Sequence, residues 1–75
     1  MTQIAPRITV DSEVRFGKPV IEGTRVPVAV VVGAVAAGDS LQEVAGEYGI
    51  TVEDVRAALS YAARRLEEEA IRVHG

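Results

Sequence analysis

Few side chains in this sequence are of a type that could carry a reaction. The chain holds no cysteine and a single histidine, His74. A Ser/His/Asp or Cys/His arrangement needs a histidine held between a nucleophile and an orienting group. Structural zinc sites draw several ligands from cysteine and histidine. The sequence therefore predicts neither nucleophilic catalysis nor a zinc site.

Two short motifs resemble ligand sites, but their spacing is wrong. Gly17-Lys18 looks like the end of a phosphate-binding loop, yet Ser12 replaces the required glycine and Pro19 replaces the residue that should bind magnesium. The acids of Glu67–Glu69 are consecutive, so a helix spreads them around its axis and they cannot converge on one metal ion. We expect no enzyme activity, no cofactor, no metal and no small-molecule substrate.

The composition indicates a protein that needs support from a second subunit. The chain has 75 residues, of which 48% are hydrophobic and only 4% aromatic. A domain of this size buries about 60% of the surface that its unfolded chain exposes, so its stability alone is marginal. Because the sequence excludes disulfides, association with a second copy is the remaining common source of stability. We therefore predict a homodimer.

Charge is distributed unevenly along the chain. The net charge is -3, with +1 in residues 1–26 and -4 in residues 39–75. Since neutralisation of phosphates supplies most of the affinity of nonspecific DNA binding, any DNA contact must be local. The longest uncharged run, Val26–Gly38, is shorter than the roughly 20 residues that cross a bilayer. We expect a cytoplasmic protein without membrane contact.

Residues 1–26 are predicted to form strand and turn. Ile8–Val10 alternates apolar and polar residues, as a half-buried strand does. Gly17 and Gly23 each predict a turn, with a short extended segment at Pro19–Ile21 between them. So short a strand needs a neighbour, either Ile8–Val10 of its own chain or the same segment of a second chain.

We interpret this segment as a structural clasp, shared between two chains. The five donors of Arg25 are expected to tie the carbonyls of the turn together. The clasp comprises Gly17, Lys18, Pro19, Val20, Ile21, Gly23, Thr24 and Arg25.

Residues 27–75 are predicted to be helical, within a single domain that covers residues 1–75. Pro27 suits the first residue of a helix and Gly38 its end, which places a helix at Val28–Ala37. Ser40-Leu41-Gln42-Glu43 fits a capping box for a second helix that runs to Tyr48.

A third helix is predicted to begin near Thr51, where Glu53 and Asp54 suit the positive end of the helix dipole. No proline or glycine interrupts Val52–Val73, and apolar residues recur there at spacings of three and four. Two capped helices joined by a tight turn suggest a helix-turn-helix. The alternative is a plain helical hairpin.

In a helix-turn-helix, the first helix needs a small residue where the second helix crosses it. The turn needs a glycine that can adopt a positive φ, and the second helix needs an apolar residue that closes the core. Ala45, Gly49 and Val55 meet these demands. The fold class is therefore mainly α: a small homeodomain-like domain of three helices with a short N-terminal strand or hairpin. The candidate DNA contacts on the last helix are Thr51, Arg56 and Ser60, although the neighbouring Glu53 and Asp54 would repel phosphate.

The string Phe16–Val28, Phe-Gly-Lys-Pro-Val-Ile-Glu-Gly-Thr-Arg-Val-Pro-Val, closely resembles the signature of the domain-of-unknown-function 433 family. The resemblance continues through Ala37-Gly38, Glu43-Val44, Glu47-Tyr48, Glu53–Leu59 and Tyr61-Ala62, and it covers roughly residues 8–63. Many relatives have Tyr-Pro and a longer turn where this chain has Tyr48-Gly49-Ile50-Thr51. DNA contacts of the family are therefore not carried over residue by residue.

The resemblance implies a helix-turn-helix antitoxin of the VapB type, which neutralises a PIN-like ribonuclease toxin and regulates its own operon. The alternative is a protein–protein interaction module without DNA-binding activity. The acidic C-terminal half favours this alternative, since an acidic segment could cover a basic RNA-binding cleft.

The C-terminal tail is a candidate toxin-binding segment. Leu66, Ala70 and Val73 continue the apolar seam at helical spacing and could anchor the tail in a groove of the toxin. The alternative is that the tail packs on its own dimer or frays.

Overall fold

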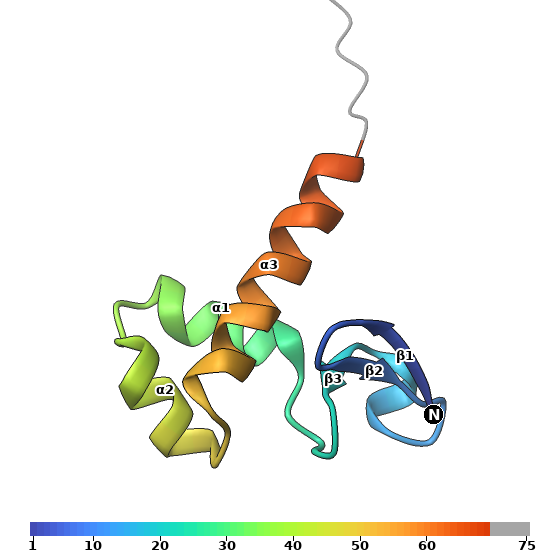
Figure 1. Cartoon of the computed structure of the whole chain (residues 1–75), viewed down its shortest axis with the longest axis horizontal. Helices are drawn as coiled ribbons and strands as arrows, with labels where there is room; N and C mark the ends of the chain where they lie inside the picture. Colours follow the sequence, from blue (N-terminus) through green and yellow to red (C-terminus); the bar gives the residue numbers. More distant parts are fainter. Residues whose placement is uncertain (70–75) are drawn as a thin grey trace, which may run out of the picture.

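A small sheet lies beside a cluster of three helices (Figure 1), in a computed structural model that describes residues 1–69. The strands are β1 (Thr2–Ala5), β2 (Ile8–Val10) and β3 (Val20–Ile21). A short 3-10 turn, η1 (Arg15–Gly17), connects β2 to β3. The helices are α1 (Val28–Ala36), α2 (Leu41–Tyr48) and α3 (Val52–Glu68). The prediction of three helices preceded by a short strand segment is confirmed.

The sheet is antiparallel with the strand order β1-β2-β3, so that β2 is central. β3 pairs with β2 of its own chain, with Ile8 opposite Ile21, which is one of the two neighbours that the sequence allowed. Thr9, the polar residue of the alternating segment, is buried and is paired with Gln3 on one side and Val20 on the other. β1 was not predicted, because the turn that connects it to β2 uses Arg7 at a φ of 65° instead of a glycine.

Residues 19–28 form a closed hairpin that joins the sheet to α1. The N–H of Ile21 donates to the Val26 carbonyl (2.9 Å), and the N–H of Val28 donates to the Pro19 carbonyl (3.0 Å). Gly17 and Gly23 have φ of 79° and 76°, so the two predicted turns are confirmed. Pro27 lies just before α1 and not at its first position, a difference of one residue.

Local sequence signals set the ends of α2 and α3. The predicted capping box of α2 is present: the N–H of Glu43 donates to Ser40 Oγ (3.1 Å), and the N–H of Ser40 donates to Glu43 Oε1 (2.9 Å). Gly49 ends α2 in the left-handed conformation, with a φ of 66°. α3 ends at Glu68, and the backbone of Glu69 is extended.

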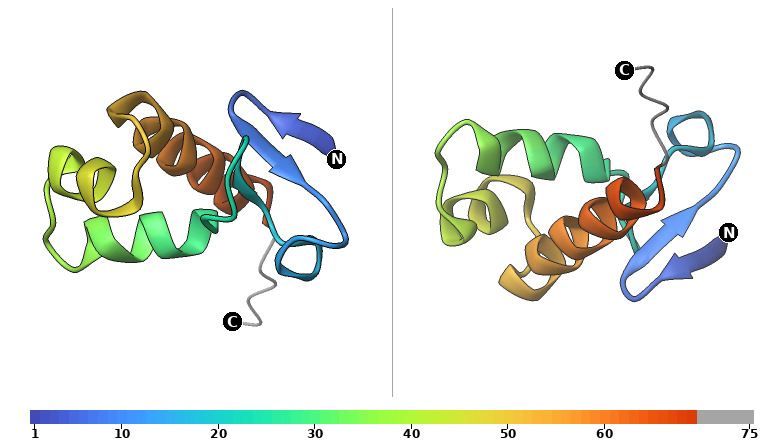
Figure 2. Two further views of the ribbon diagram at one scale, coloured as in Figure 1. Left: turned by 90° about the horizontal axis from the view of Figure 1, so that it is seen from below. Right: turned by 90° about the horizontal axis from the view of Figure 1, so that it is seen from above.

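The core lies where α1, α2 and α3 meet the inner face of β2 and β3. Its buried residues are aliphatic and of small or medium size: Ile8, Ile21, Val28, Val31, Val44, Ala45, Val55 and Ala58. The N-terminal half of α3 packs on α1 and α2, while its C-terminal half runs beyond the other elements (Figures 1 and 2). Two parts of the molecule therefore have few neighbours: the end of α3 and the loop that contains η1.

Candidate partner and nucleic-acid surfaces

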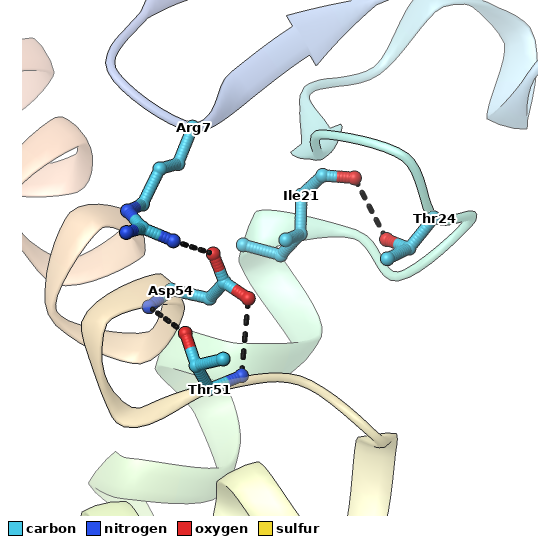
Figure 3. A network of polar contacts seen from close by, with 5 residues as sticks. All are labelled: Arg7, Ile21, Thr24, Thr51 and Asp54. Atoms are coloured by element: carbon cyan, nitrogen blue, oxygen red, sulfur yellow. Dashed lines mark hydrogen bonds and ion pairs between the residues drawn. The ribbon is translucent and has the colours of Figure 1, made fainter.

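The start of α3 is tied to the sheet by one ion pair. Arg7 Nη1 lies 3.0 Å from Asp54 Oδ1 and connects the β1–β2 turn to the first turn of α3 (Figure 3). Asp54 also completes a capping box with Thr51: Oδ2 accepts from the Thr51 N–H (3.0 Å), and Thr51 Oγ1 accepts from the Asp54 N–H (3.1 Å). Sequence reasoning placed Asp54 at the helix start but did not foresee Arg7, which is 47 residues away.

The surroundings of Asp54 favour its charged form. Burial acts to raise the pKa of the Asp54 carboxyl. This effect is outweighed by hydrogen bonds from the Thr51 backbone, the Arg7 guanidinium and the Thr51 hydroxyl, and by the charge of Arg7, so the pKa is lowered overall. Asp54 is therefore a structural carboxylate that connects α3 to the sheet.

The three candidate DNA contacts are all exposed on α3. Thr51 uses its hydroxyl oxygen in the helix cap, whereas neither Arg56 nor Ser60 has a side-chain hydrogen bond within residues 1–69. Glu53 is exposed at the start of the same helix. The start of this helix thus carries the cation of Arg56 next to the acid of Glu53, which is a weak arrangement for binding phosphate.

In the clasp, Thr24 makes the contacts that were expected of Arg25. Thr24 Oγ1 donates to the Ile21 carbonyl (2.7 Å; Figure 3) and accepts from the Val26 N–H (3.0 Å). Arg25 is exposed and makes no side-chain hydrogen bond among residues 1–69, so the role suggested for it in the clasp stays a prediction. The Thr24 hydroxyl, which both donates and accepts, closes this turn. Val20 and Ile21 are buried, while Lys18 and Gly23 are exposed.

Of the three tail anchors, Leu66 is the one that the structure describes. It is 66% exposed near the end of α3, and Ala70 and Val73 lie outside the described residues. Arg65 and Glu68 form an exposed ion pair with an Nη1–Oε2 distance of 3.5 Å. The end of α3 therefore presents an apolar side chain surrounded by charges.

An apolar groove runs between α1 and the C-terminal half of α3. Its volume is about 490 Å³, and polar side chains contribute only at its borders. We name it the α1/α3 groove; its lining residues are Lys18, Pro19, Val28, Ala29, Val32, Gly33, Tyr61, Ala62, Arg65 and Leu66. Sequence reasoning missed this groove, because its two walls are 30 residues apart in the chain.

Phe16 is a second feature that sequence reasoning missed. It is the only phenylalanine in the chain and is 97% exposed. Arg15, Phe16 and Gly17 have φ of 53°, 58° and 79°, three consecutive residues in the left-handed region. A left-handed backbone costs a non-glycine residue about 1–2 kcal/mol. The fold therefore holds an aromatic ring in solvent at an energetic cost.

Other kinds of site find no support within residues 1–69. No group of three or more His, Cys, Asp or Glu side chains is placed to hold a metal ion there. None of the described helices combines the length and apolar character that crossing a membrane requires.

Comparison with known proteins identifies relatives of different length. A Mycobacterium tuberculosis protein named "Putative antitoxin VapB45" is 39% identical over 56 residues, which are 75% of this chain and 23% of that protein. The crystal structure of M. tuberculosis Rv2018 is 40% identical, with a TM-score of 0.65 over 69% of this chain and 24% of that one. The chain thus spans about a quarter of the length of these relatives.

A shorter relative has also been solved. The crystal structure of a DUF433 member protein from Anabaena variabilis is 32% identical, with a TM-score of 0.74 over 83% of this chain and 62% of that one. The model of the family described as protein of unknown function (DUF433) matches residues 8–62. That match contains the clasp, α1, α2 and the start of α3, and it confirms the resemblance carried by the string Phe16–Val28. The chain therefore belongs to the DUF433 family.

Proposed function

We propose that this chain is an antitoxin-like protein that acts by binding a partner, a PIN-like ribonuclease toxin. The observation that carries the proposal is the end of α3, which extends past the domain with Leu66 66% exposed. A relative named as an antitoxin, 39% identical over 56 residues, supports the same role.

The chemistry of the helix end suits a nuclease surface. Glu67, Glu68 and Glu69 are all exposed and follow directly after Leu66. A cleft that binds RNA is basic, so acids on the antitoxin complement its rim while an apolar side chain enters a groove. Leu66 is the described anchor, and Ala70 and Val73 continue the proposed series.

Deletion of residues 67–75 tests this proposal. We expect the truncated protein to lose its affinity for the purified toxin in calorimetric titration, and to keep its melting temperature because Glu67–Glu69 lie outside the core. Arg56→Ala, on another part of α3, serves as the control and should bind the toxin unchanged. Undiminished affinity of the truncated protein would exclude the tail and direct attention to the clasp.

We further propose that α2 and α3 form a helix-turn-helix that binds operator DNA. Ala45 and Val55 are buried at the crossing, and Gly49 provides the left-handed turn, as this motif requires. In this case Arg56→Ala should weaken specific binding by about 1–3 kcal/mol, and affinity should fall steeply with salt. Equal binding of the wild type to its promoter fragment and to random DNA would contradict it.

One observation favours the second candidate, an interaction module without DNA-binding activity. Asp54 is held at the start of α3 by Arg7, and Glu53 is exposed next to it. Glu53 stands where a recognition helix enters the major groove, and its carboxylate would meet phosphate there. The comparison of promoter and random DNA separates the two candidates.

A further inference from the structure

Two apolar features of this molecule have no partner within the described chain, and they lie next to each other. One is the ring of Phe16, and the other is the α1/α3 groove. Lys18 connects them, since it borders the groove and also borders the shallow hollow beside Phe16. A projecting ring and an apolar groove therefore share one side of the molecule.

The ring does not fill the groove of its own chain. The left-handed backbone of Arg15, Phe16 and Gly17 directs it outward, where 97% of the residue is exposed. Backbone strain of this kind persists only where the surrounding structure enforces it, and it concentrates at sites of interaction.

We propose that Phe16 of each copy inserts into the α1/α3 groove of a second copy of this chain, so that the homodimer is held by two identical contacts. A two-fold interface requires that each copy offer both halves of the contact, and the adjacent ring and groove satisfy this requirement. The inference rests on the proposed homodimer, and it shares Leu66, which lines the groove, with the proposed toxin contact.

The groove suits an aromatic ring in shape and in charge. Ala29, Gly33 and Ala62 are small residues of its walls and leave room for a large flat side chain. Lys18 and Arg65 also line it, and cations are attracted to the face of an aromatic ring. The same cations would repel a basic side chain, so the groove is not suited to bind one.

The size of the core gives a reason for the second copy. None of the core residues is larger than isoleucine, and Phe16, the largest apolar side chain after the tyrosines, lies outside it. Insertion of two rings adds aromatic burial to that of Tyr48 and Tyr61, which are only partly buried against the core.

Two variants test the contact from opposite sides. Phe16→Gly removes the ring, and glycine tolerates the left-handed backbone at this position, so the fold should persist. Gly33→Leu fills the groove, and a Cβ at Gly33 meets no atom within 4 Å, so it should also fold. Sedimentation equilibrium should show that each variant raises the dimer dissociation constant about 100-fold.

Gly46→Leu is the matched control for Gly33→Leu. It too places a leucine on a helix where a Cβ meets no atom within 4 Å, but on α2, away from the groove. The control should dimerise like the wild type. A dimer that survives both Phe16→Gly and Gly33→Leu would refute the contact while leaving the homodimer itself intact, and a monomeric wild type would refute both.

The absence of cysteine allows a direct second measurement. A mixture of Phe16→Cys and Ala62→Cys chains should form a disulfide-linked heterodimer under mild oxidation. A mixture of Phe16→Cys with Glu47→Cys, whose cysteine is on α2, should not. Equal cross-linking in the two mixtures would overturn the proposed arrangement.

Discussion

The carboxylate of Asp54 connects two parts of the chain that are distant in sequence. It accepts from Thr51 within α3 and from Arg7 in the β1–β2 turn. Asp54→Asn keeps the shape of the side chain but removes its charge, and should therefore destabilise the fold at neutral pH.

The size of that effect should depend on pH with a defined sign. The pKa of Asp54 is lower in the folded chain than its ordinary value of 3.8, so its contribution to stability is complete above pH 3.8 and is lost as the pH falls through the folded pKa. Urea unfolding of the wild type and Asp54→Asn from pH 7 to pH 2 should show two stabilities that converge below pH 3.8. A constant difference down to pH 2 would show that the charge of Asp54 is not what stabilises the fold.

Residue types that act locally were predictable, and those that act at a distance were not. Ser40 and Glu43 are three residues apart, and their capping box follows from the sequence. The contact between Arg7 and Asp54 depends on how the sheet and α3 come together. The exposure of Phe16 depends on a left-handed backbone at Arg15 and Phe16, which no sequence rule predicts for residues other than glycine and asparagine.

At the scale of the element, substitution by alanine should change the stability of the fold in opposite directions at two glycines of the α2 region. Gly46 lies inside α2 with no atom within 4 Å of an added Cβ, so Gly46→Ala should stabilise by about 0.5–1 kcal/mol through helix propensity. Gly49 has equally open surroundings but a φ of 66°, so Gly49→Ala should destabilise by about 1–2 kcal/mol.

Chemical denaturation of these two variants measures backbone conformation alone, because neither added methyl group meets a neighbour. Unchanged or increased stability of Gly49→Ala would mean that the turn between α2 and α3 is not held in the left-handed conformation. The measurement therefore checks the geometry on which the proposed helix-turn-helix depends.

The elements themselves were largely predictable because their boundaries are set by local chemistry. Gly38, Ser40 and Gly49 delimit α1 and α2 as expected. The sheet was harder, since β3 has only two residues and its pairing with β2 is a tertiary contact. The α1/α3 groove was beyond prediction, because its walls become neighbours only after the core has formed.

At the scale of the whole molecule, stability depends on a few medium-sized side chains. Val55 is fully buried at the centre of the core. Val55→Ala should cost about 2 kcal/mol, and a loss of this size lowers the melting temperature of so small a domain by about 8–16 °C.

Val30 provides the matched control for Val55. It lies on α1 with 37% of its surface exposed, so Val30→Ala should change the melting temperature by only a few degrees. Equal losses in the two variants, measured by calorimetry at one protein concentration, would contradict the assignment of the core. The concentration must be fixed because an associating protein melts at a concentration-dependent temperature.

The ion pair between Arg7 and Asp54 also has a consequence for synthesis on the ribosome. These residues are 47 positions apart, and Ile8 depends on Val55 for its place in the same core. At about 5–20 residues per second, the N-terminal strands wait roughly 2–10 s for α3 to be translated. Until then Arg7 of the β1–β2 turn lacks its ion-pair partner Asp54, and the sheet lacks the apolar residues of α3. Folding of the newly made chain should therefore begin among the helices, and the first residues to be translated should be among the last to become ordered.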